Sequence, residues 1–203
     1  MADERVFYTH PMARGRTVRW MLEEIGVPYR TELLEYDASM KAPAYLAIDP
    51  MGKVPAIRHG DTVVTEGAAI CAYLADAFPA TGLAPPPGDR LRGPYYRWLF
   101  FGAGPVEAAV TNKALNVVLP PGRERMEGSR IFDSVINMLE IAVSGGEYSA
   151  GNRFTAADLY LGSQIGFGMI DKRPALEQYW ARIGARPAAI RAREIDDALM
   201  PKP

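Results

Sequence analysis

The sequence predicts a chain in two parts, an α/β part followed by an all-helical part. Over residues 1–79, short runs rich in β-branched and aromatic residues alternate with segments of helical apolar spacing. A stretch dense in proline and glycine, "PATGLAPPPGDR" (79–90), then interrupts this pattern. Beyond it, every periodic segment has helical spacing. We therefore predict an N-terminal domain at 1–79, a linker at 80–87 and a helical domain at 88–203.

The predicted elements of the first part follow in order. "RVFYT" is typical of a buried strand, and "RTVRWMLEEIG" of an amphipathic helix that stops at Gly26. "PYRTELLEY" predicts a second strand, and "MKAPAYLAIDP" a short helix or turn. "VPAIRHGDTVVTE" predicts a hairpin that turns at Gly60 and Asp61, and "GAAICAYLADAFP" predicts a helix. This order favours a small mixed sheet with helices on its faces.

The second part of the sequence predicts helices throughout. "LRGPYYRWLFFGAGPVEAAVTNKAL" predicts a long helix with glycine and proline irregularities, and "RERMEGSRIFDSVINMLEIAVS" a second helix. In "FTAAD", Thr155 and Asp158 form a variant of the capping box that begins the next helix. Two more helices open on proline, and the mixed charge of "RPAAIRAREIDDALMPKP" predicts a solvated final helix.

Composition excludes several classes of protein. The chain has 203 residues and a formal net charge of −1, with 48% hydrophobic and 23% charged residues, which is typical of a globular protein. Scattered basic residues argue against nucleic-acid binding. The N-terminus resembles no signal peptide, and no apolar run is long enough to span a membrane, so we expect a cytoplasmic protein. The single cysteine, Cys71, is typical of a buried helix residue, and His10 and His59 lack metal-ligand spacing.

Four motifs occur in a definite order along the chain: "HPMARGRTVRWMLEEIGVPY", "DPMGKVPAI" (49–57), "TEGAAICAYLADAFP" (65–79) and "GNRFTAADLYLG" (151–162). Together they resemble the cytosolic glutathione transferases of the bacterial type over essentially the whole length. The resemblance implies a thioredoxin-like N-terminal domain, a C-terminal helical bundle and a homodimer. It also implies a detoxification reaction in which glutathione, the co-substrate, is conjugated to a small hydrophobic electrophile, without a metal.

The resemblance assigns the glutathione contacts residue by residue. Val54 is expected to pair its backbone with the cysteinyl part of glutathione, beside a cis Pro55, with a trans proline that begins a strand as the alternative. Glu66 is expected to meet the γ-glutamyl ammonium, although a plain solvated carboxylate is the alternative. Gly67 replaces the serine or threonine that the family uses for the γ-glutamyl carboxylate. Met12 and Lys53 are further candidates for glutathione binding.

The family places a serine or a cysteine where this chain has Ala13, so the expected donor to the glutathione sulfur is missing. The remaining catalytic candidates are Arg14, which adds positive charge where a helix begins, and the hydroxyls of Tyr8 and Thr9. A core or lining role is the alternative for Tyr8.

Four residues are candidates for the electrophile pocket: His10, Tyr95, Trp98 and Phe101. A plain loop role is the alternative for the histidine, and an ordinary core role or a dimer contact for the aromatic residues. The resemblance leads to three possible functions. The first is a glutathione transferase, and the second is a weakly active or non-catalytic glutathione-binding scaffold, because Ala13 and Gly67 replace hydroxyl residues. A glutathione-dependent reductase or isomerase acting through the sulfur of glutathione is a third.

Overall fold

A computed structural model describes residues 4–123 and 132–200, and its packing divides the chain into two compact units. Residues 1–81 group with residues 186–203, and residues 82–185 form the second unit. This grouping differs from the predicted limits at the end of the chain, because the last helix packs with the thioredoxin-like unit instead of with the other helices. Among the described residues, no helix is long and apolar enough to cross a membrane.

The first unit contains a four-stranded mixed sheet with the strand order β2-β1-β3-β4. The strands are β1 (Arg5–Thr9), β2 (Arg30–Leu33), β3 (Ala56–His59) and β4 (Thr62–Thr65). β2 runs parallel to β1, whereas β3 is antiparallel to both β1 and β4. This is the thioredoxin-like arrangement that the sequence predicted, with the β3–β4 hairpin turning at Gly60 and Asp61.

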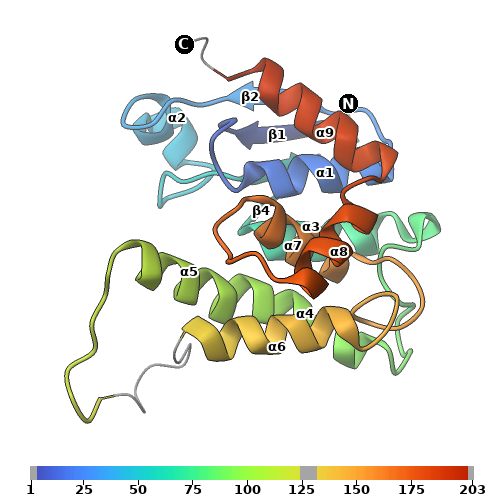
Figure 1. Ribbon diagram of the computed structural model, residues 1–203. Helices are drawn as coiled ribbons and strands as arrows, with labels where there is room; N and C mark the ends of the chain where they lie inside the picture. Colours follow the sequence, from blue (N-terminus) through green and yellow to red (C-terminus); the bar gives the residue numbers. More distant parts are fainter. Residues whose placement is uncertain (1–3, 124–131, 201–203) are drawn as a thin grey trace. The chain divides into compact units, whose positions relative to one another are not determined.

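Four helices belong to the same unit: α1 (Gly15–Ile25), α2 (Pro43–Leu46), α3 (Gly67–Ala77) and α9 (Pro187–Ala198). Short 3-10 turns, η1 (Ser39–Lys41) and η2 (Pro79–Thr81), complete it. α1 ends at Gly26, which has a φ of 73° and donates its N–H to Leu22 O, as the sequence predicted. Figure 1 shows α9 lying along α1.

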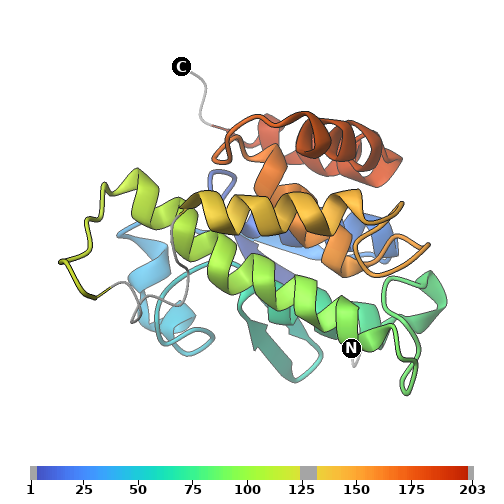
Figure 2. The ribbon, with the colours of Figure 1, turned by 60° about the horizontal axis from the view of Figure 1, so that its bottom comes forward.

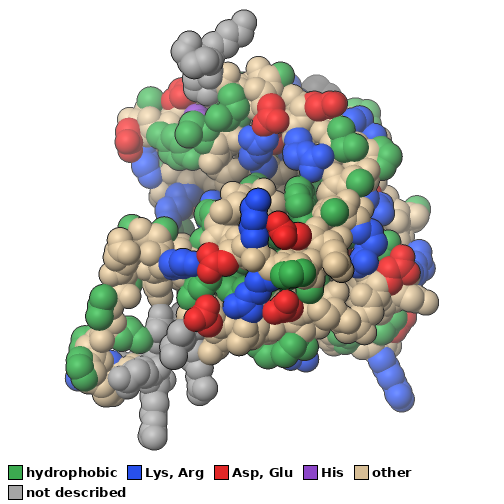
Figure 3. Space-filling model, in the orientation of Figure 1, with side chains coloured by type: hydrophobic (Ala, Val, Ile, Leu, Met, Phe, Trp, Pro, Cys, Tyr) green, Lys and Arg blue, Asp and Glu red, His purple; other side chains and the backbone are tan. Residues whose placement is uncertain are grey.

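Ion pairs join α9 to α1. Arg19 Nε donates to Asp196 Oδ1 at 2.6 Å, and both side chains are only 1% exposed. Arg16 pairs with Asp197, and Arg191 Nε with Glu23 Oε2 at 3.2 Å. The predicted solvated helix is therefore wrong for one face of α9, which buries Asp196 together with three alanines: Ala188, Ala189 and Ala192. On the face of the molecule that Figure 3 shows, basic and acidic side chains lie beside one another.

The second unit contains α4 (Arg92–Phe101), α5 (Glu107–Ala114), α6 (Phe132–Ser144), α7 (Ala156–Gly166) and α8 (Pro174–Ile183). A π-helical turn, η3 (Gly102–Val106), contains Pro105 and joins α4 to α5 as one irregular helical run, as predicted. Figure 2 shows this run beside α6. Residues 124–131 of the predicted second helix lie outside the described residues.

The predicted capping box is present at the start of α7. Asp158 is fully buried, and its Oδ2 accepts from the N–H and the hydroxyl of Thr155, each at 2.8 Å. Its Oδ1 accepts from the N–H and hydroxyl of Ser149 and from the Tyr179 hydroxyl at 2.6 Å. Burial, together with the nearby Asp158 carboxylate, raises the pKa of Tyr179. One carboxylate therefore ties α7 to α8 and to the loop before α7.

Candidate functional site

Three segments with predicted site residues meet at one edge of the sheet. Tyr8, near the end of β1, pairs with Ala56 at the start of β3, and Ala56 pairs with Thr65 at the end of β4. The turn after β1, the Val54–Pro55 bond before β3 and Glu66 after β4 therefore lie at the same edge. Because α1 and α3 both begin there, their N-terminal amides favour an anion at this edge.

The Val54–Pro55 peptide bond is cis, as predicted. The loop before it is held by side chains: Asp49 accepts from the N–H groups of Met51 and Lys53 at 3.1 and 2.9 Å. The Tyr45 hydroxyl donates to the carbonyl of Lys53. Val54 is half-buried, so this fixed loop presents its backbone at the edge of the sheet.

Lys41 is a cation at this edge that the sequence analysis missed. Its ammonium donates to the carbonyls of Met51 and Gly52 at 3.1 and 2.9 Å. Gly52 has a φ of 59°, and a Cβ there would lie 2.6 Å from the carbonyl oxygen of Met40, so the loop needs glycine. No spacing in the sequence connects Lys41 with Met51 and Gly52, because the contact forms only when the loop folds back.

Glu66 has a backbone conformation that few residues adopt. Its φ is 66° and its ψ 118°, and it is exposed directly before Gly67, the first residue of α3. Such a conformation costs roughly 1–3 kcal/mol and clusters at functional sites. The strained position supports a role for Glu66 beyond that of a plain surface carboxylate.

The turn after β1 is held together by His10. Its carbonyl accepts from Ala13 N at 2.9 Å, and its Nδ1 accepts from Met12 N at 3.2 Å. The imidazole is buried and packs against the Tyr36 ring in a tilted arrangement, with 4.5 Å between ring centres. Its Nε2 lies 3.8 Å from a Glu35 carboxylate oxygen. His10 is therefore a structural residue of this turn, which favours the plain loop role that the sequence left open. Its place in the electrophile pocket stays a prediction.

The Thr9 side chain is buried under the start of α1. The residue is fully buried, and a Cβ on Gly15 would lie 2.0 Å from its Oγ1, so the side chain is covered by the start of α1. A hydroxyl in that position faces the helix and not the open edge. The burial counts against a catalytic role for Thr9, which stays a prediction, because α1 packs on the face of β1 that carries this side chain.

Tyr8 lies on the other face of β1, because side chains alternate along a strand. It is half-buried and packs against Tyr45 with 5.5 Å between ring centres, next to Met40 and Ala56. These contacts favour the lining role that the sequence left open.

The two arginines of the turn are placed differently. Ala13 and Arg14 are half-buried directly before α1, which begins at Gly15. Arg16 donates to the carbonyl of Pro11 at 3.3 Å and pairs with Asp197 of α9. Arg16 is therefore engaged within the protein. The role of Arg14 as the cation beside a bound thiolate stays a prediction.

The aromatic candidates of the second unit lie on α4. Tyr95 and Trp98 are 1% and 6% exposed, whereas Phe101 is half-buried with its ring edge-on to Trp98. The burial of Tyr95 and Trp98 favours the core role that the sequence left open for them.

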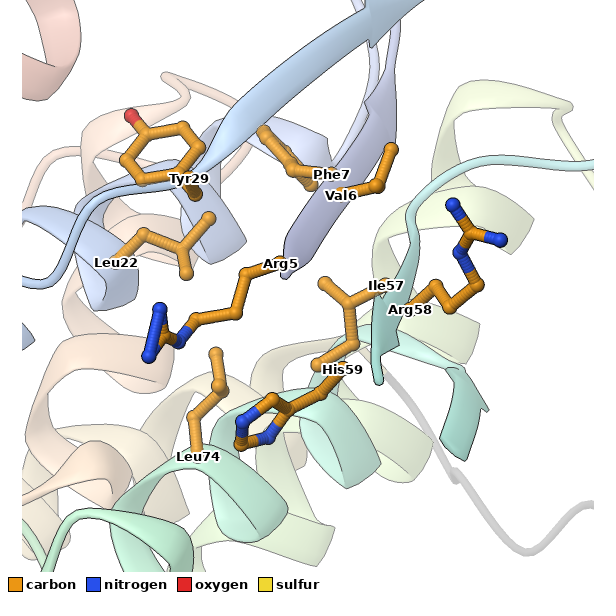
Figure 4. A pocket seen from close by; sticks show the side chains of 9 residues that line it. All are labelled: Arg5, Val6, Phe7, Leu22, Tyr29, Ile57, Arg58, His59 and Leu74. Carbon is orange, nitrogen blue, oxygen red and sulfur yellow. The ribbon is translucent and has the colours of Figure 1, made fainter. Parts of the chain in front are cut away.

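Two features lie away from this edge. Figure 4 shows a small pocket in which Arg5 points between Leu22 of α1 and Leu74 of α3, beside His59. Because Arg5 pairs with His59 across the sheet, the pocket is at the opposite end of β1 from Tyr8. Cys71 is buried in α3, and burial raises its pKa to about 12, so the thiol stays protonated near neutral pH.

Comparisons with known proteins agree with this geometry. The model of the glutathione S-transferase N-terminal domain family matches residues 12–77. Glutathione S-transferase F9 of Arabidopsis thaliana is 29% identical over 91% of this chain and 93% of its own length. The glutathione S-transferase-like protein gedE of Aspergillus terreus is 31% identical over 68% of this chain and 67% of its own. A sphingomonad glutathione S-transferase, solved with glutathione, is 28% identical and superimposes with a TM-score of 0.75 over 95% of this chain and 98% of its own.

Proposed function

The chain belongs to the glutathione S-transferase family, and we propose that it conjugates reduced glutathione to a small hydrophobic electrophile at the sheet edge described above. The observation that carries this proposal is the cis Val54–Pro55 bond at the same edge as Glu66 and the turn after β1. An extended backbone, an acidic group and the starts of two helices suit the three polar parts of glutathione.

Each part of glutathione has a proposed partner. The N–H and C=O of Val54 pair with the cysteinyl residue, like an added strand. Glu66 pairs with the γ-glutamyl ammonium, and the first amides of α3, including that of Gly67, hold its carboxylate. Lys41 and Lys53 supply positive charge for the glycine carboxylate. The thiol is then directed toward Ala13, with Met12 and Arg14 beside it.

The stabilisation of the thiolate is the weak point of this site. Lowering a thiol pKa from about 8.5 by ~2 units takes ~2.7 kcal/mol. A helix N-terminus supplies about 0.3–1 kcal/mol, and a surface cation such as Arg14 about 0–1 kcal/mol. The backbone N–H groups of Met12 and Ala13 already donate hydrogen bonds to His10, so in this arrangement they do not stabilise a thiolate. We therefore expect a slow transferase whose rate rises with pH until the bound thiol is ionised.

A weakly active glutathione-binding protein is the second candidate, and Ala13 and Gly67 favour it. Two measurements separate the candidates: conjugation of a general aromatic electrophile, and calorimetric titration with reduced glutathione. Conjugation above the buffer rate supports the transferase, whereas binding without turnover supports the carrier. The Glu66→Gln variant is expected to weaken glutathione binding, and Asp61→Asn, an exposed change in the hairpin turn, serves as its matched control. If both variants bind glutathione equally well, Glu66 is not a glutathione-binding residue.

The assembly and the location are proposals of the same kind. A homodimer is typical of this family and is proposed for this chain, and sedimentation of the purified chain would test it. A cytoplasmic location agrees with the proposed use of reduced glutathione, and fractionation of cells that produce the chain would test it.

A further inference from the structure

Arg16 connects the turn after β1 with the last helix of the chain. Its Nη1 donates to the carbonyl oxygen of Pro11 at 3.3 Å, and its Nη2 donates to Asp197 Oδ1 in α9. The Arg16 side chain is 23% exposed, so most of it is packed against the protein. One guanidinium therefore spans from the turn to a helix that lies 181 positions later in the sequence.

The backbone next to Asp197 is held by a buried ion pair, whereas the Asp197 side chain itself is 64% exposed. Asp196, which precedes Asp197, is buried and bonded to Arg19 of α1 at 2.6 Å. That pair fixes the end of α9 against α1, and it leaves Asp197 beside Arg16. An arginine side chain has many rotamers, and an ion pair on one nitrogen reduces the entropy that is lost when another nitrogen bonds a carbonyl. Asp197 therefore prepares Arg16 to hold Pro11.

We propose that Arg16 and Asp197 form a brace that positions the turn at residues 10–13 against glutathione, so that the C-terminal helix sets the affinity of the site. The inference rests on the proposed function, because it needs glutathione at this turn. Because residue 13 is alanine, no side-chain hydroxyl at this position can hold the glutathione sulfur in place. The position of the sulfur therefore depends on the backbone of the turn. Both residues act through the Pro11 carbonyl and are positioning residues.

The experiment compares two ion pairs that join the same two helices. Asp197→Asn breaks the brace, whereas Arg191→Gln breaks the pair between Arg191 and Glu23, at the other end of α1. Glutathione affinity is measured by calorimetry, and KM for each substrate by conjugation kinetics. We expect Asp197→Asn to raise the glutathione Kd and KM by about 2- to 10-fold, the range of one lost hydrogen bond, with the electrophile KM unchanged.

Two further variants separate positioning from general stability. Asp197→Glu keeps the carboxylate and is expected to restore most of the affinity. Arg16→Lys keeps the charge but not the planar fork, and it is expected to match Asp197→Asn. The double variant, Arg16→Lys with Asp197→Asn, is expected to bind no more weakly than either single variant, because both changes break one connection.

The outcomes distinguish the brace from the function on which it rests. If the unchanged protein binds glutathione and Asp197→Asn changes its Kd no more than Arg191→Gln does, the brace is refuted and the proposed function stands. Additive losses in the double variant also refute the brace. If the unchanged protein binds no glutathione at millimolar concentration, the proposed function and the brace fail together.

Discussion

The buried pair between Arg19 and Asp196 allows a quantitative test of how α9 is held. Asp196→Asn removes the negative charge at nearly constant volume and leaves the guanidinium of Arg19 buried without its counter-charge. Arg19 keeps its hydrogen bonds to Tyr29 and Thr31, each at 3.2 Å, and its place over the Phe7 ring at 5.1 Å. These contacts orient the cation but do not neutralise it.

The expected loss follows from the burial of both partners. At an effective dielectric constant near 20, unit charges about 4 Å apart attract by roughly 4 kcal/mol. Breaking a buried pair by removing one partner costs about 3–5 kcal/mol, in agreement with that figure. For a chain of this size, each kcal/mol of lost stability lowers Tm by about 2–4 °C. We therefore expect Asp196→Asn to lower Tm by roughly 6–20 °C. Arg191→Gln, which breaks a half-exposed pair, is expected to cost less than about 1 kcal/mol.

Urea unfolding followed by tryptophan fluorescence and by circular dichroism measures these losses. The double variant, Arg19→Met with Asp196→Leu, is expected to lose less than Asp196→Asn, because it removes both buried charges. The structure gives a reason: among the described residues, Arg19 Nη2 and Asp196 Oδ2 are buried without a hydrogen-bond partner. A loss below about 1 kcal/mol for Asp196→Asn, or a larger loss for the double variant, would refute the reasoning.

Three further predictions concern the turn and the cap of α7. Ala13→Ser is expected to raise kcat/KM for conjugation by about 10-fold or more, since a hydrogen bond to a charged group contributes ~1.5–3 kcal/mol; unchanged kinetics would show that residue 13 faces away from the sulfur. Asp158→Asn is expected to lower the free energy of unfolding more than Thr155→Ala does, because five donors point at the Asp158 carboxylate. Thr155→Ala removes only a helix cap, which contributes ~1 kcal/mol. Equal losses of the two variants in urea unfolding would contradict this prediction. Gly15→Ala is expected to cost ~1–3 kcal/mol by crowding Thr9, and adding Thr9→Ala should recover most of it; a stabilised single variant would contradict the close packing.

The sequence by itself determined the features that depend on neighbouring residues. The apolar spacing and Gly26 were sufficient to predict α1 and its end. Gly60 and Asp61 were sufficient to predict the turn of the β3–β4 hairpin. The capping box at Thr155 was predictable because both partners lie within three positions. The family resemblance, and not any local spacing, predicted the cis bond before Pro55.

Only the tertiary structure decided which side chains meet across long separations. Asp196 and Asp197 looked like part of a solvated helix, because their partners on α1 lie far away in the sequence. Thr9 and Tyr8 both looked available to the site, but the packing of α1 on one face of β1 buries Thr9. Charge and hydroxyl groups can be listed from a sequence, whereas their solvation and their partners depend on which surfaces the fold brings together, and these decide what chemistry the groups can do.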